Sequence, residues 1–148
     1  MDPSKKLILD ACLKKQNDLI DNFKSRLKSM ESDVFEFDHS PSQTESRAAG
    51  KIELLNAVGK EHDFAKREME FLKTLDSEKE NSIVEPGAVV VTKQLTFYIS
   101  VSIEEIEVQG KSIFGISTKA PIYAAMRGLE KGAVFKFNET EYHIETIY

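Results

Sequence analysis

The sequence has few of the features that accompany export, disulfide bonding or membrane insertion. It contains one cysteine, Cys12, and no tryptophan among 148 residues. A single cysteine cannot form an internal disulfide bond, which fits a reducing compartment. No apolar segment of the signal-peptide kind follows the first residues, and the apolar run Ala88–Val91 is far too short to span a bilayer. We therefore expect a cytoplasmic protein with no membrane segment.

An excess of positive charge is also absent. Lys and Arg number 20 against 25 Asp and Glu, which gives a net charge of -5. Proteins that bind nucleic acid without regard to sequence gain affinity by neutralising phosphates, so this balance argues against that class. It does not exclude docking on a protein that itself holds nucleic acid.

Two parts of different composition follow one another along the chain. Charged residues are concentrated in the first 80 residues, whereas Val, Ile, Phe, Tyr and Gly are more frequent afterwards. The first composition is typical of helices that expose much of their surface, and the second of strands and turns. The sequence therefore predicts an α+β protein with a helical part at 1–80 and a strand-rich part at 84–148.

The helical part carries two apolar seams with steps of three and four residues. The first seam consists of Leu9, Leu13, Gln16, Ile20, Phe23, Leu27 and Met30, and the second of Ile52, Leu55, Val58, His62, Ala65, Met69 and Leu72. Such seams are typical of helices that pack along each other. Ser40 and Pro41 suit the start of the second helix. An antiparallel coiled-coil hairpin would bury both seams and leave residues 33–39 as an acidic tip.

The second part predicts short strands and one helix. We expect strands at 88–92, 95–102, 107–108, 113–117, 133–137 and 142–147, with a short helix beginning at Pro121. A turn around Asn138, Glu139 and Thr140 should join the last two strands.

Two stretches of this second part resemble the bacterial Gre transcript-cleavage factors. They are Gly115–Ile122, which contains Ser-Thr-Lys-Ala-Pro-Ile, and Met126–Val134, which contains Arg-Gly-Leu-Glu-Lys-Gly. The resemblance implies an FKBP-like antiparallel sheet domain with one short helix. It further implies a factor that binds RNA polymerase and inserts its hairpin in the secondary channel to promote cleavage of backtracked RNA.

The resemblance also implies roles for particular residues. The family's tip holds an Asp and a Glu three residues apart, which Asp33 and Glu36 match without the family's flanking Gly and Asn; Asp38 is a third carboxylate in the same segment. These acids would share Mg²⁺ with the polymerase active centre, since Mg²⁺ prefers oxygen ligands. The chain would have no cofactor of its own and would not be an enzyme itself. It would meet nascent RNA only within the polymerase complex.

The polymerase contact would lie at the turn before the short helix. Lys119, Ala120, Pro121 and Ile122 align with the family's docking turn, although Ala120 stands where the family commonly has Ser.

Two other functions stay open at this point. One is a Gre-like regulator that occupies the channel without stimulating cleavage. The other is an FKBP-type prolyl isomerase with a helical arm, which would need Phe97, Tyr98, Phe114 and Tyr123 to line one pocket. The sequence does not fix the oligomeric state.

Overall fold

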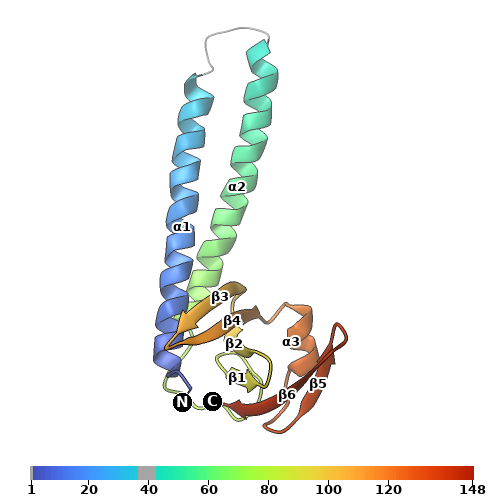
Figure 1. Ribbon diagram of the computed structural model, residues 1–148. Helices are drawn as coiled ribbons and strands as arrows, with labels where there is room; N and C mark the ends of the chain where they lie inside the picture. The colour runs from blue at the N-terminus through green and yellow to red at the C-terminus, as the bar shows by residue number, and fades with distance from the viewer. Residues whose placement is uncertain (1, 37–42) are drawn as a thin grey trace. The chain divides into compact units, whose positions relative to one another are not determined.

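The structure is a computed structural model that describes residues 2–36 and 43–148, with the side chains of 33–36 and 43–48 outside the described part. It has the α+β class predicted from the sequence: two long helices precede a six-stranded sheet with one short helix (Figure 1). The chain divides into two compact units. Residues 1–15 and 70–148 form the sheet unit, and residues 16–69 form the helical unit. The first residues of the predicted hairpin therefore belong to the sheet unit.

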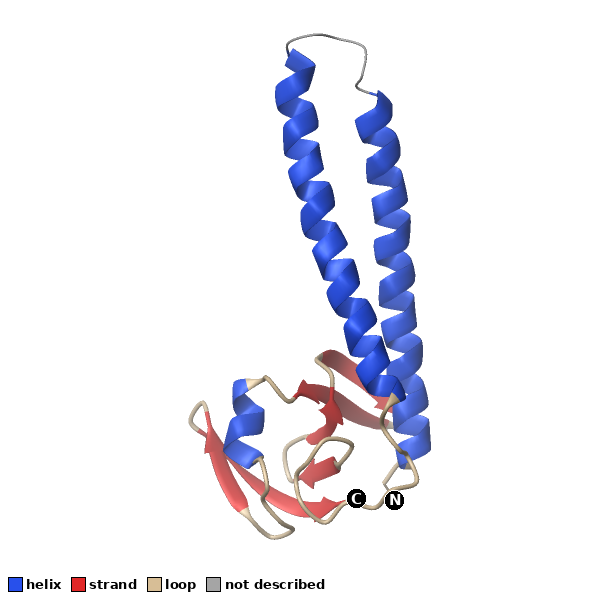
Figure 2. Cartoon of the chain, turned by 180° about the vertical axis from the view of Figure 1, so that it is seen from behind, coloured by secondary structure: helices blue, strands red, loops and turns tan. Residues whose placement is uncertain are grey.

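The helical unit contains most of α1 (Lys5–Glu36) and α2 (Gln43–Lys73). The two helices lie side by side and run in opposite directions, as Figures 1 and 2 both show. Gln16, the polar member of the first seam, is buried and donates from Nε2 to the carbonyl oxygen of Ala65 at 2.9 Å. This bond satisfies a polar group that burial would otherwise penalise, and it fixes the register of the helix pair.

Most of the predicted seam positions are covered, but one is not. Ile20, Val58 and Ala65 are buried, whereas Ile52 is 44% exposed. Each residue advances about 100° around a helix, so two successive three-residue steps from Ile52 to Val58 leave the two side chains about 120° apart. The prediction that Ile52 belongs to the seam is therefore wrong.

The predicted tip begins later than expected. The backbone of α1 stays helical through Glu36, so residues 33–36 extend the helix instead of forming a loop. The rest of the predicted tip, 37–39, and the predicted helix start at Ser40 and Pro41 lie outside the described residues.

The sheet has the strand order β3-β4-β2-β1-β6-β5. Its strands are β1 (Val89–Thr92), β2 (Thr96–Ser100), β3 (Ile103–Val108), β4 (Lys111–Ser117), β5 (Val134–Phe137) and β6 (Thr140–Ile147). The predicted antiparallel sheet is wrong in one respect, because β2 and β4 pair in parallel from Thr96↔Ile113 to Ser100↔Ser117. After β2 the chain skips one position to form β3, and β4 returns between them in the direction of β2.

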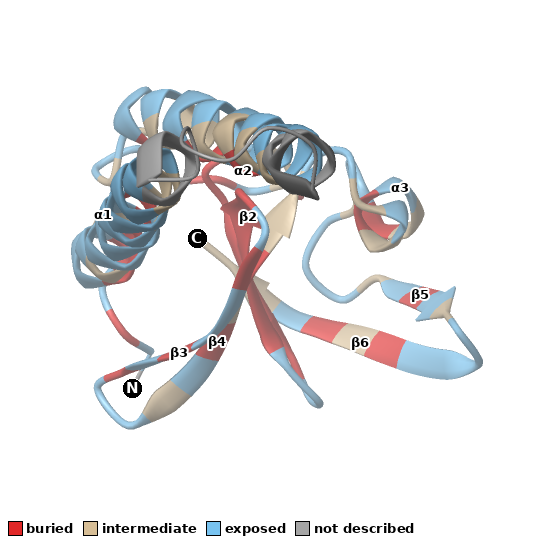
Figure 3. Ribbon diagram, turned by 90° about the horizontal axis from the view of Figure 1, so that it is seen from above, coloured by how far each residue is buried: buried red, intermediate tan, exposed pale blue. Residues whose placement is uncertain are grey.

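The central strands are covered on both faces within the sheet unit. On β2, Tyr98 joins a core with Ile8, Leu9 and Cys12 of α1, while Phe97 and Ile99 join a second core on the opposite face. The second core includes Tyr123 and Met126 of α3 (Pro121–Met126). Figure 3 colours β2 as buried along its length. Strands buried on both faces read as continuous apolar runs, which explains the sequence Ala88–Val91.

Two-residue turns join β3 to β4 and β5 to β6. Asn138 and Glu139 have φ of 48° and 65°, the left-handed values that such turns require. The turn lies where it was predicted, except that Thr140 already belongs to β6. Gln109 and Gly110, at 50° and 78°, form the β3–β4 turn, for which no turn was predicted from the sequence. None of the described helices carries an apolar stretch of the length and purity that crossing a bilayer would require.

Candidate functional site

The turn between β4 and α3 is held by hydrogen bonds among its own residues. Ser117 Oγ accepts a hydrogen bond from the Lys119 amide at 3.1 Å, and the Ser117 carbonyl accepts one from the Ala120 amide at 3.0 Å. Ala120 then caps α3 with an extended backbone, and its carbonyl accepts from the Tyr123 amide at 3.0 Å. Pro121 occupies the first helical position, where no amide hydrogen is needed. These bonds order the turn in the unbound chain.

The four predicted docking residues lie together in this turn, with different exposures. Lys119 and Pro121 are exposed, and Ala120 and Ile122 are half-buried. Ile122 also packs against the second core, so part of its side chain supports α3. The outward face of the helix carries Pro121 and Ala124, both exposed.

The segment after α3 is fixed to distant parts of the sheet unit. Gly128, in the left-handed region at φ 78°, donates to the carbonyl of Val84 at 2.9 Å, and the Val84 amide donates to Leu129 O at 2.9 Å. Gly132, at φ 88°, donates to Ile144 O at 2.9 Å. The glycines permit these reversals at little steric cost. Both ends of α3 are therefore anchored, and its outward face is presented as a rigid surface.

The side chains of the three acids predicted to act at the tip lie outside the described part of the structure. Asp33 and Glu36 belong to the last turn of α1, but their side chains, and the whole of Asp38, lie outside the described part. Among the residues whose side chains are described, no group of three or more His, Cys, Asp or Glu could hold a metal ion. His62 lies half-buried on α2, and its Nε2 has no hydrogen-bond partner within the described residues.

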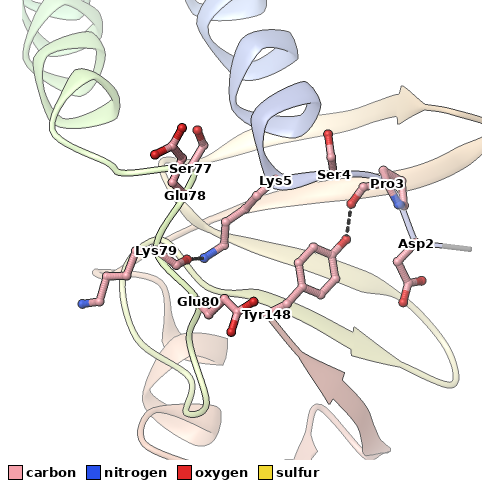
Figure 4. Close-up of a pocket in the computed structure, with 9 residues that line it drawn as sticks. All are labelled: Asp2, Pro3, Ser4, Lys5, Ser77, Glu78, Lys79, Glu80 and Tyr148. Carbon is pink, nitrogen blue, oxygen red and sulfur yellow. Dashed lines mark hydrogen bonds between the residues drawn. The ribbon is translucent and has the colours of Figure 1, made fainter.

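A cavity of about 400 Å³ lies where three distant segments meet, at residues 2–5, 77–80 and 148 (Figure 4). Lys5 is 6% exposed and donates from Nζ to the carbonyl of Lys79 at 2.6 Å and to Asn81 Oδ1. Tyr148 donates from its hydroxyl to Pro3 O at 2.5 Å. No sequence motif could have indicated this cavity, because its residues are separated by most of the chain.

The polar groups around this cavity do not converge on a ligand. Figure 4 shows the carboxylates of Asp2, Glu78 and Glu80 pointing in different directions, while Lys5 and Tyr148 bind the protein's own backbone. Burial, followed by the nearby Lys79, lowers the pKa of Lys5. We interpret these contacts as an anchor that holds the N-terminal residues, the 77–81 segment and the C-terminal residue together.

Burial keeps the one thiol of the chain, that of Cys12, in its protonated form. Cys12 is 0% exposed, and burial raises its pKa to about 12. A thiol with this pKa is protonated at neutral pH, and the thiol is a far weaker nucleophile than the thiolate. Cys12 therefore acts as a small apolar side chain of the core.

The aromatic residues needed by the isomerase alternative do not share a pocket. Phe97 and Tyr98 are adjacent on β2, so their side chains point to opposite faces and enter different cores. Tyr123 is 7% exposed and packs in the same core as Phe97. Phe114 is half-buried and packs against that core as well. Because Tyr98 lies on the other face of the sheet, the four side chains do not line one pocket, which the isomerase alternative would need.

The architecture that emerges is a helical hairpin followed by a mixed-sheet domain with an anchored surface helix. No protein-family model matches the chain, and no curated protein sequence matches it. A solved structure of the transcription factor Gfh1 is 14% identical, with 93% of this chain and 94% of that chain covered and a TM-score of 0.35. The crystal structure of GreA factor homolog 1 of Thermus thermophilus is 15% identical, with 92% and 94% covered and a TM-score of 0.34.

Proposed function

We propose that this chain is a Gre-like transcription elongation factor that docks on RNA polymerase and inserts its helical hairpin in the secondary channel. The observation that carries the proposal is the anchored turn at 117–121. It presents the residues that resemble the family's docking turn, in a chain whose N-terminal part is a hairpin. A pre-ordered surface of this kind loses little conformational entropy on binding.

In this function the tip would act by contributing carboxylate oxygens. Mg²⁺ bound in the polymerase would stabilise the attacking and leaving oxygens of the RNA phosphodiester. Asp33, Glu36 and Asp38 would supply ligand or orienting oxygens for that centre, and the polymerase would supply the others. The chain itself would be an accessory factor that stimulates cleavage by the polymerase, and it would reach nascent RNA only within that complex.

A second candidate is a regulator that occupies the channel without stimulating cleavage. The observation that favours it is the extent of α1: the backbone is helical through Glu36, so two of the three predicted acids stand in a helix and not in a loop. Both candidates share the partner and the docking turn, and they differ only in what the tip does.

Docking is tested by titrating the full chain with the cognate RNA polymerase. Replacing Pro121 by Asp and Ala124 by Glu places charge on the outward face of α3, where both residues are exposed. We expect polymerase affinity to fall at least tenfold because two charges would be desolvated at the contact. Ile122 is left unchanged because it supports the core, so thermal unfolding should stay close to that of the wild type. Unchanged affinity would remove the turn from the proposed interface.

A further inference from the structure

Exposed cations without ion-pair partners stand at both ends of α3. Lys119 precedes the helix, and Arg127 and Lys131 follow it; all three are exposed. None of them forms an ion pair with any residue in the part of the chain that the structure describes. Between Ser117 and Gly132 the one acidic residue is Glu130. This is a locally positive surface on a chain whose net charge is -5.

Several other charged residues of the sheet unit lie beside a residue of opposite charge or among acids. Lys111 pairs with Asp2 at 2.5 Å, and Lys136 stands directly across from Glu141 in the β5–β6 register. Exposed Glu104, Glu105 and Glu107 all lie on β3, with the buried Ile106 between the last two. What distinguishes the 117–132 segment is that it carries three exposed cations and one acidic residue, Glu130, whereas exposed acids predominate on β3.

The centre of this surface is apolar and rigid. Between the cations α3 presents Pro121 and Ala124, which are exposed, and Ala125, which is half-buried. These side chains have almost no rotamer entropy to lose on binding. The helix of six residues is about 9 Å long, close to the Debye length of about 8 Å at physiological ionic strength. The fields of the cations at its two ends therefore overlap above the apolar centre.

We infer that this surface recognises an acidic protein surface, an apolar spot flanked by Asp or Glu side chains, on the polymerase. The inference rests on the proposed function, and it adds the chemistry of the partner to it. The cations favour an acidic partner because opposite charges attract. The apolar centre between them favours a protein surface over nucleic acid. A nucleic-acid surface would need more cations along a backbone track and exposed aromatic rings for stacking, whereas the one aromatic residue of α3, Tyr123, is buried.

Two double variants with the same change in net charge test the inference. Arg127→Gln with Lys131→Gln removes two of the flanking cations. Lys93→Gln with Lys136→Gln is the matched control, because both lysines are exposed in the same unit but lie outside the surface at 117–132. Each full-length chain is titrated with the cognate polymerase at about 50 and 300 mM salt. We expect the first variant to bind about fivefold more weakly at low salt and to lose much of the salt dependence. The control should bind within twofold of the wild type.

The other outcomes separate the inference from the proposed function. If the wild type binds polymerase and the first variant matches it, or loses affinity with its salt dependence intact, the inference is overturned and the proposed function stands. If the wild type does not bind polymerase at all, the proposed function fails, and the inference that depends on it fails with it. A third titration uses labelled single-stranded RNA alone. Tight binding that the first variant abolishes would overturn the assignment of a protein partner.

Discussion

At the scale of single residues, burial decides which chemically capable groups are available. Cys12 is fully buried, so its thiol packs as a small apolar group and is not available as a nucleophile. Lys5 shows the limit of reasoning from the sequence. A lysine in the first turn of a charged helix is expected to be solvated, yet Lys5 is 6% exposed because it donates to Lys79 and Asn81, more than 70 residues away. Tertiary contacts of this range leave no local sequence pattern.

The buried thiol predicts a specific loss of stability at alkaline pH. The folded state raises the pKa of Cys12 from 9.0 to about 12, so the folded protein holds this proton more tightly than the unfolded chain does. The resulting stabilisation is complete below pH 9 and is lost between pH 9 and 12, with a slope approaching about 1.4 kcal/mol per pH unit. Cys12→Ala should remove this part of the slope. Urea unfolding at several pH values measures it.

The comparison must use the slope, because Cys12→Ala also changes packing at every pH. Burial raises the pKa of Tyr148 to about 12 as well, so the variant should keep the portion of the slope that begins near pH 10. Identical slopes for variant and wild type between pH 9 and 10 would show that Cys12 does not titrate as described.

Gly115 is the residue where the close approach of the backbone leaves no room for a side chain. A Cβ atom there would lie 2.5 Å from the carbonyl oxygen of Val101 and 2.8 Å from Cβ of Ile103. Because both neighbours are fixed in or beside the sheet, Gly115→Ala should lower the free energy of unfolding by about 1–3 kcal/mol. Equilibrium urea denaturation measures this change. A neutral result would mean that the contact with Val101 relaxes freely.

At the scale of elements, local sequence patterns predicted the helices and most of the strands but not how the strands pair. The steps of three and four residues predicted both long helices, and a composition rich in Val, Ile, Phe and Tyr, interrupted by turn residues, predicted the strands that became β1, β2, β4, β5 and β6. The parallel pairing of β2 with β4 could not be predicted in this way. Pairing depends on which strand the chain inserts between two others, and a strand's own sequence does not encode that. β3 was predicted too short because Glu104 and Glu105 interrupt its alternation at a bulge.

The two glycines of α2 yield a prediction for the stability of that helix. A Cβ atom added at Gly50 or at Gly59 would meet nothing within 4 Å, so close helix packing does not require glycine at either position. Replacing each by Ala should raise helix stability by up to about 1 kcal/mol, because glycine carries the larger entropy cost of folding. Thermal unfolding of the two single variants and the double variant measures the gain. Destabilisation by either substitution would indicate a contact to that face in solution.

At the scale of the whole molecule, the proposed function separates docking from chemistry. The turn and surface cations at 117–132 belong to the sheet unit, whereas Asp33 and Glu36 belong to the helical unit. Variants of one should therefore leave the other intact. The docking turn and the tip acids were both suggested by resemblance of short sequence stretches to the Gre factors. For the turn, the structure adds the hydrogen bonds that anchor it. The tip remains a prediction from the sequence, because its side chains lie outside the described residues.

The tip prediction is made for the complex with polymerase and not for the free chain. Two or three exposed carboxylates cannot build the near-octahedral shell that Mg²⁺ requires, so titration calorimetry of the free protein should detect no site-specific Mg²⁺ binding. In stalled transcription complexes, the paired substitutions Asp33→Asn and Glu36→Gln preserve size and remove charge. If these acids supply oxygens to the cleavage centre, transcript cleavage should fall by at least about a hundredfold, while polymerase affinity stays within a few-fold of the wild type.

Asp38→Asn serves as the test of register, because it removes the third carboxylate of the same segment. Loss of cleavage with Asp38→Asn, together with full activity of the Asp33→Asn variant, would shift the functional acid beyond the end of α1. The wild-type chain decides between the two candidate functions. A chain that competes for the polymerase channel but stimulates no cleavage at any Mg²⁺ concentration is the regulator. That result would agree with the helical backbone through Glu36. Asp33 and Glu36 would then lie in a helix and not in a loop that presents them to the cleavage centre.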